Sequence, residues 1–70
     1  TSAIQLHLND ALTNLYDKNF HVAIGALDSV ISLDNQLWFA YYYRGVGYKL
    51  VGNFEEAGKN FKDAIRIKSD

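Results

Sequence analysis

The sequence contains no cysteine, no proline and no methionine among its 70 residues. Without cysteine, neither disulfides nor thiolate metal sites can add stability. A chain this short buries a small core, so it forms a single domain that is marginally stable without a partner. Because it begins with Thr1 and has no methionine, we expect it to be part of a longer protein.

Long apolar runs and a strong net charge are also missing. No apolar run is long enough to cross a bilayer, so we expect no membrane insertion. The net charge is −1, which gives no overall field that favours nucleic acid, and we expect none as a partner. The charges are uneven, however: residues 1–43 carry one lysine against four aspartates, whereas residues 44–70 carry six basic and four acidic groups.

Apolar side chains recur along the whole chain with the 3.6-residue period of an amphipathic helix. In the first segment, Ile4, Leu8 and Leu15 fall on one stripe. No comparable stretch alternates with the two-residue period of a strand, so we expect an all-α fold. The four expected helices span residues 3–17, 20–33, 36–50 and 54–67.

Capping residues mark the expected helix ends. Ser2, Asn19 and Asn53 precede the first, second and fourth helices, where their side-chain oxygens can accept a bond from a free backbone N–H. Gly52 supplies a left-handed residue after the third helix. Asp34 interrupts the chain between the second and third helices. The joints are short, so consecutive helices are expected to pack antiparallel.

The chain repeats one pattern of residues in its two halves. Asn19, Phe20, Ala23 and Ile31 recur at a constant 34-residue offset as Asn53, Phe54, Ala57 and Ile65. The two alanines are small enough for helices to cross closely, and the two phenylalanines are expected to fill the gap beside each turn. A helix–turn–helix unit with this 34-residue period is typical of the tetratricopeptide repeat.

The sequence resembles the tetratricopeptide repeat family over almost its whole length, as two repeats at about 4–37 and 38–70. The second repeat follows the family pattern W-x2-L-G-x2-Y…A-x3-F…P. Its matching positions hold Tyr41, Arg44, Gly45, Tyr48, Ala57 and Phe61, with Ser69 in the proline position. The resemblance implies two antiparallel helix-turn-helix repeats, an α-solenoid fragment without a C-terminal capping helix.

The first helix fits the repeat in two ways. Strict 34-residue spacing puts His7, Asp10 and Asn14 into positions that the family buries, where each unpaired polar group costs about 1–3 kcal/mol. A shift by one residue turns Leu8, Ala11, Leu12 and Leu15 inward instead. Apolar burial favours the shift, with a first turn one residue tighter, and the strict spacing remains the alternative.

The resemblance further implies a concave face, lined by the first helix of each pair, that holds a peptide or helix of another protein. The corresponding positions are Leu8, Leu12, Tyr16, Phe39, Tyr42, Val46 and Lys49. The family's clamp for a C-terminal carboxylate uses Lys, Asn and Arg, but its positions here hold Leu8, Leu12, Phe39 and Tyr43. We therefore expect a scaffold or adaptor module that binds a partner's peptide or amphipathic helix in an apolar, aromatic groove.

Self-association is the alternative function. With no capping helix, the fourth helix is expected to expose an apolar strip through which two copies pair into a homo-oligomer. The strip would be drawn from Phe61, Ala64, Ile65 and Ile67, with two or three of these side chains left in water.

The aromatic residues of the third helix have two interpretations. Aromatic side chains at helical spacing most often pack in a core, which we expect for Trp38, Tyr41 and Tyr43. Phe39 and Tyr42 remain open to either packing or ligand binding. Gly45 and Gly47 are expected to allow close helix packing.

No pattern of catalytic chemistry is present. The sequence has no nucleophile–base pair and no glycine-rich phosphate loop, and its two histidines and scattered aspartates form no closed set of metal ligands. We expect no enzymatic activity, no cofactor and no metal. The basic residues Lys59, Lys62 and Arg66 are expected to form a solvated face.

Overall fold

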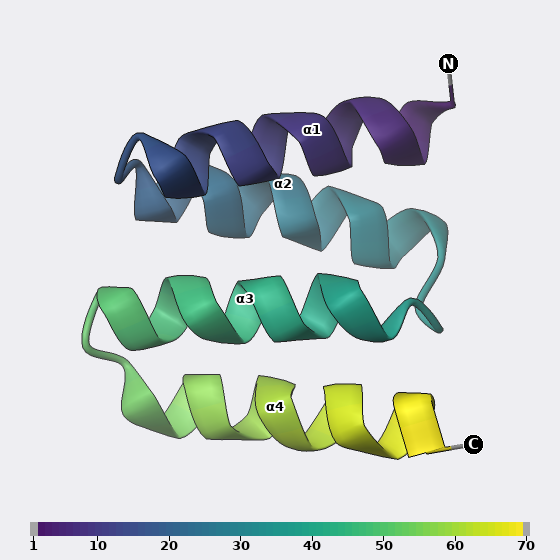
Figure 1. The fold of residues 1–70 in the computed structure, drawn as a ribbon, viewed down its shortest axis with the longest axis vertical. Coiled ribbons are helices and arrows are strands. Elements are labelled where there is room, and N and C mark those ends of the chain that lie inside the picture. The colour runs from purple at the N-terminus through teal and green to yellow at the C-terminus, as the bar shows by residue number, and fades with distance from the viewer. Residues whose placement is uncertain (1, 70) are drawn as a thin grey trace.

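The computed structural model describes residues 2–69. Four helices are present in order: α1 (Ala3–Tyr16), α2 (Phe20–Leu33), α3 (Trp38–Leu50) and α4 (Phe54–Ser69) (Figure 1). No strand occurs within these residues, which confirms the all-α class. The third helix begins two residues later than predicted, because the Asp34 carboxylate accepts the backbone N–H of Gln36 (3.0 Å) and holds a turn there.

The helices contact one another in chain order, and the chain reverses direction at each turn (Figure 1). Helix α2 packs on α1 and on α3, and α3 packs on α4, whereas α1 touches α3 only slightly. Among the four described helices, α4 contacts α3 alone. The described chain measures 28 × 28 × 16 Å, so it is a flat slab in which α4 forms one edge.

The core is built mainly from small side chains. Leu27 and Val30 are the largest side chains that are fully buried. Leu27 packs with Ala11 of α1, and Tyr43 of α3 lies against the same cluster. Helix α3 thus covers the junction between α1 and α2. The other buried apolar residues are Ala23, Ile24, Ala26, Ala40, Tyr41, Ala57 and Ala64.

The turns between α1 and α2 and between α3 and α4 are copies of each other. The end of α1 and the start of α2 recur, at the 34-residue spacing, as the end of α3 and the start of α4. Lys18 and Gly52 are equivalent at the same spacing, and both take left-handed conformations with φ of 65° and 86°. Strict 34-residue spacing therefore runs through the first repeat, and the predicted one-residue shift is wrong.

The strict spacing costs little because the three polar positions of α1 are not buried. His7 and Asn14 are half-buried, and Asp10 is exposed. The Asn14 side-chain amide donates to the backbone carbonyl of Asp10 (2.8 Å) and so has a partner. Ala11 is fully buried in this register, whereas Leu12, which the shift would bury, is 37% exposed. The number of buried apolar side chains favoured the wrong register because this side of α1 is exposed to solvent.

Two of the three predicted N-caps form. Ser2 and Asn53 each accept the backbone N–H three residues further on, at 3.1 and 3.3 Å. Asn19 makes no such bond. Its side-chain amide donates instead to the Asn14 side-chain oxygen across the turn (3.3 Å), which leaves the start of α2 without a side-chain cap.

The phenylalanines that open α2 and α4 differ in burial. Phe20 is half-buried and shares a hollow with Leu50 and Val51 at the end of α3. Phe54 is 70% exposed, so the prediction that it fills the gap beside its turn is wrong. The difference follows from the order of contacts: α3 lies beside α2, but no described helix lies beyond α4.

We expect Lys18→Gly to raise the free energy of unfolding by about 0.5–1 kcal/mol. A residue with a Cβ is strained at φ 65°, and glycine is not, although glycine loses more chain entropy on folding. Urea denaturation with an unchanged m-value measures the gain. Lys18→Ala is the control, because it removes the same charge and keeps the strain. An equal gain from Lys18→Ala would mean that charge, not conformation, is responsible.

Candidate functional site

An open groove lies between α3 and α4. It has a volume of about 360 Å³ and a largely apolar lining. The lining consists of Trp38, Tyr42, Phe61, Ala64, Ile65 and Lys68. Two of the apolar lining residues are well exposed, Tyr42 at 44% and Ile65 at 66%. The groove therefore presents aromatic and aliphatic surface to the outside.

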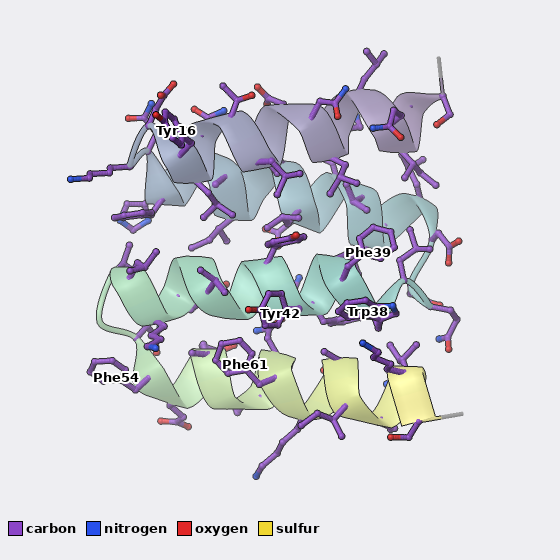
Figure 2. The ribbon with its side chains drawn as sticks, in the orientation of Figure 1. Tyr16, Trp38, Phe39, Tyr42, Phe54 and Phe61 are labelled. Atoms are coloured by element: carbon purple, nitrogen blue, oxygen red, sulfur yellow. The ribbon has the colours of Figure 1, made fainter. Side chains whose placement is uncertain are left out.

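Aromatic contacts hold the groove in shape. The Tyr42 ring lies 6.3 Å from the Trp38 ring and 5.9 Å from the Phe61 ring, measured between centroids. Figure 2 shows these three side chains on the facing sides of α3 and α4. Such tilted pairs each add about 0.5–1.5 kcal/mol beyond their area burial. The α3 wall and the α4 wall are thus joined through Tyr42 and Phe61.

Gly45 allows Phe61 to lie close to α3. A Cβ built at this glycine would lie 2.7 Å from Cε1 of the Phe61 ring, closer than carbon atoms approach in proteins. Gly47, two residues on, has the same relation to Ile24 of α2, with a Cβ at 2.8 Å from Cγ1. Both predicted packing glycines are confirmed: one brings α4 close to α3, and the other brings α2 close.

A lysine stands at the end of the groove where α3 begins. The Lys68 ammonium lies 4.1 Å from the centroid of the Trp38 ring, within range of a cation–π interaction. Lys62 and Lys68 stand three residues before and after Ile65, so all three share one face of α4. In the described part of the chain, neither lysine is within ion-pair distance of a carboxylate, whereas Lys59 and Arg66 each are.

A polar cluster around Arg44 fixes α4 against α3. The Arg44 Nε donates to the side-chain oxygen of Asn60 on α4 (2.7 Å), and another guanidinium nitrogen donates to Asp28 on α2 (2.9 Å). The guanidinium lies 5.5 Å from the Tyr41 ring centroid. Asn60 is 3% exposed, and its amide donates to the backbone carbonyl of Glu56 (2.9 Å). This cluster thereby sets the separation of the two groove walls.

The sequence contains a signal for this cluster. Arg44 fills an apolar position of the family pattern, and Asn60 lies on the inner face of the fourth helix. Two polar residues in apolar positions of neighbouring helices indicate a buried polar pair, because neither is tolerated there alone.

Of the predicted peptide-binding residues, Tyr42 alone lines the groove. Phe39 is half-buried and lies on the side of α3 toward α2 (Figure 2). Tyr16 is 87% exposed at the end of α1. The remaining predicted residues are half-buried at Leu8 and Val46 and exposed at Leu12 and Lys49. The groove therefore runs between the two helices of one pair, not along the first helices of both pairs.

The predicted self-association strip is narrower than expected. Phe61, Ala64 and Ile65 line the groove, whereas Ile67 does not. Ile65 is exposed, but Ala64 is buried, and Phe61 and Ile67 are half-buried. The prediction is an uncovered strip drawn from these four residues, but only Ile65 is exposed, because α3 already covers most of that face of α4.

Comparisons with protein-family models, curated proteins and solved structures found no match for this chain. Across residues 2–69, no helix has the length and apolar character needed to cross a membrane. Within the same residues, no three histidine or carboxylate side chains gather where they could hold a metal ion. The groove is the feature from which we infer a function.

Proposed function

We propose that this chain is a protein-interaction module of the tetratricopeptide type, which binds an amphipathic helix of another protein in the groove between α3 and α4. The observation that carries this proposal is the exposed apolar lining, with Tyr42 and Ile65 at its centre. Contiguous aromatic and aliphatic surface of this kind is typical of helix-in-groove recognition.

The tetratricopeptide assignment is supported by the strict 34-residue period and by the order of contacts. Both turns have the same bounds and the same left-handed residue, at Lys18 and Gly52. Each helix packs on the next, as in an α-solenoid of antiparallel pairs. In such an array, the surface of one pair is completed by the following helix.

The first repeat supports a helix as the occupant. Leu27 and Val30 correspond at 34-residue spacing to Phe61 and Ala64 of the groove. Both are fully buried, because α3 covers the α1–α2 pair through Tyr43. The same surface of the second repeat has no helix over it within the described chain. A helix placed as α3 is placed would fill it.

Charge and polarity favour a different protein over a second copy of this chain. Groove-to-groove pairing would bring the Lys62 and Lys68 side chains of two copies together, which is repulsive. Head-to-tail stacking would insert α1, in which Asn9 corresponds to the Tyr43 that closes the first repeat. An asparagine against aromatic rings would lose its hydrogen bonds to water.

The test uses a synthetic peptide with the sequence of residues 36–51 and phenylalanine in place of Trp38. This segment contains the helix that fills the corresponding surface of the first repeat. The protein's single tryptophan lies in the groove, so its fluorescence reports binding directly. We expect the Trp38 fluorescence to change and to saturate as the peptide is added. Tyr42→Ala should weaken binding by about 1–2 kcal/mol, because it removes the central aromatic side chain.

Tyr16→Ala is the matched control, since it removes the same side chain far from the groove. It should leave the peptide affinity unchanged. No saturable binding, or equal losses for Tyr16→Ala and Tyr42→Ala, would contradict the proposal. Sedimentation that shows a dimer competing with the peptide would favour self-association instead.

A further inference from the structure

One of the residues that line the groove is charged, and it lies at one end. Lys68 and Trp38 lie together at the end where α4 finishes and α3 begins. The other lining residues are aromatic or aliphatic. The long apolar stem of Lys68 lines the groove, and its ammonium rests on the Trp38 ring without a carboxylate partner in the described residues. That ammonium can turn to a carboxylate of an occupant while its stem stays in contact with the groove.

The first repeat shows which way an occupant would run. Helix α3 begins at Trp38, just after the end of α2, and runs back along it (Figure 1). Asp34, the C-terminal flanking residue of α2, corresponds at 34-residue spacing to Lys68. A helix placed on α4 as α3 is placed on α2 would therefore begin beside Lys68. This position is therefore acidic in the first repeat, which α3 covers, and basic in the second repeat, whose groove is uncovered within the described residues.

A helix N-terminus carries about half a positive charge, from its free backbone N–H groups. Such an end beside the Lys68 ammonium is unfavourable unless the helix brings its own negative charge. Aspartate or glutamate in the first turn of the partner helix removes this repulsion. Its carboxylate is attracted both to its own helix N-terminus and to the Lys68 ammonium.

We propose that the groove selects a partner helix that carries carboxylates at its N-terminal end and docks with that end against Lys68. This inference rests on the proposed function and adds to it the orientation and the charge of the partner. The apolar face of the partner helix covers Tyr42, Phe61 and Ile65, and its acidic N-terminal end pairs with Lys68.

The test compares three synthetic peptides. The first has the sequence of residues 36–51 with phenylalanine in place of Trp38. The second carries two additional glutamates at its N-terminus, and the third carries them at its C-terminus, so the last two share one composition. We expect the second peptide to bind about 3- to 10-fold more tightly than the third, as expected for one surface ion pair with a dipole contribution. The preference should shrink as salt is added.

Lys68→Gln should abolish the preference between the two acidic peptides, because it removes the charge that distinguishes them. Lys59→Gln is the matched control, because Lys59 lies next to Glu55 and Glu56 and does not line the groove. It should keep the preference. A spin label on the peptide N-terminus should broaden the amide signals of Trp38 and Lys68, whereas a C-terminal label should not.

The outcomes separate this inference from the proposed function. If all three peptides bind with equal affinity, the groove binds helices but Lys68 does not select them, and the inference is overturned alone. Tighter binding of the C-terminally acidic peptide, with its C-terminal label beside Lys68, would overturn the orientation. If none of the three binds, or if a second copy of this chain occupies the groove, both the proposed function and this inference fail.

Discussion

Replacing Arg44 by methionine is expected to lower the free energy of unfolding by about 2–4 kcal/mol. The substitution keeps a long apolar side chain over Tyr41 and removes the donor to the buried side-chain oxygen of Asn60. A hydrogen bond to a charged donor contributes about 1.5–3 kcal/mol, and the contact of the guanidinium with the ring adds about 0.5–1 kcal/mol. Urea denaturation followed by circular dichroism measures the loss.

Two further variants assign this loss to Asn60. Asp28 is exposed, so Asp28→Ala, which removes only the ion pair with Arg44, should cost less than about 1 kcal/mol. Adding Asn60→Leu to Arg44→Met should recover part of the stability, because an apolar pair leaves no buried acceptor without a donor. If Arg44→Met costs no more than Asp28→Ala, the contact with Asn60 does not hold α4 in place.

Gly47→Ala is expected to destabilise the fold by a net of about 0.5–2 kcal/mol, although alanine is the better helix former. The new methyl group would lie 2.8 Å from Cγ1 of Ile24, a buried side chain whose inner carbon cannot swing aside. Overpacking of this kind outweighs the gain in helix propensity of about 1 kcal/mol. Thermal and urea denaturation of the variant measure the net effect.

Gly58→Ala is the matched control and should change stability in the opposite direction. No atom lies within 4 Å of a Cβ built at Gly58, so only the helix propensity changes and we expect a gain of about 0.5–1 kcal/mol. If Gly47→Ala were as stabilising as Gly58→Ala, α2 and α3 would not pack as closely as described.

The 3.6-residue apolar spacing and the capping residues predicted the number, type and approximate bounds of the helices, because both are local properties of the sequence. The register of α1 was harder to predict from the sequence. Buried apolar area favoured a shifted helix, whereas the structure keeps the shared turn geometry and leaves Leu12 at the surface. The energetic comparison assumed that every first-helix position is covered, and this side of α1 is not.

The groove itself was only partly predictable. Tyr42 and Ile65 were each singled out from the sequence, but for two separate surfaces. They line one groove because Phe61 packs against Gly45 and Lys68 lies over Trp38, and these contacts join residues 16 and 30 positions apart. Helical periodicity states which residues share a face of one helix. It does not state which faces two crossing helices leave uncovered.

Among the four described helices, α4 packs on α3 alone, so the groove depends on a helix with a single neighbour. Local opening of α4 removes one wall without disturbing the contacts among α1, α2 and α3. The lifetime of the groove is then set by how long α4 stays packed on α3, not by how long the whole chain stays folded. A helix bound in the groove would contact both walls and would tie this edge into the cooperative unit, so binding and local ordering of α4 are the same event.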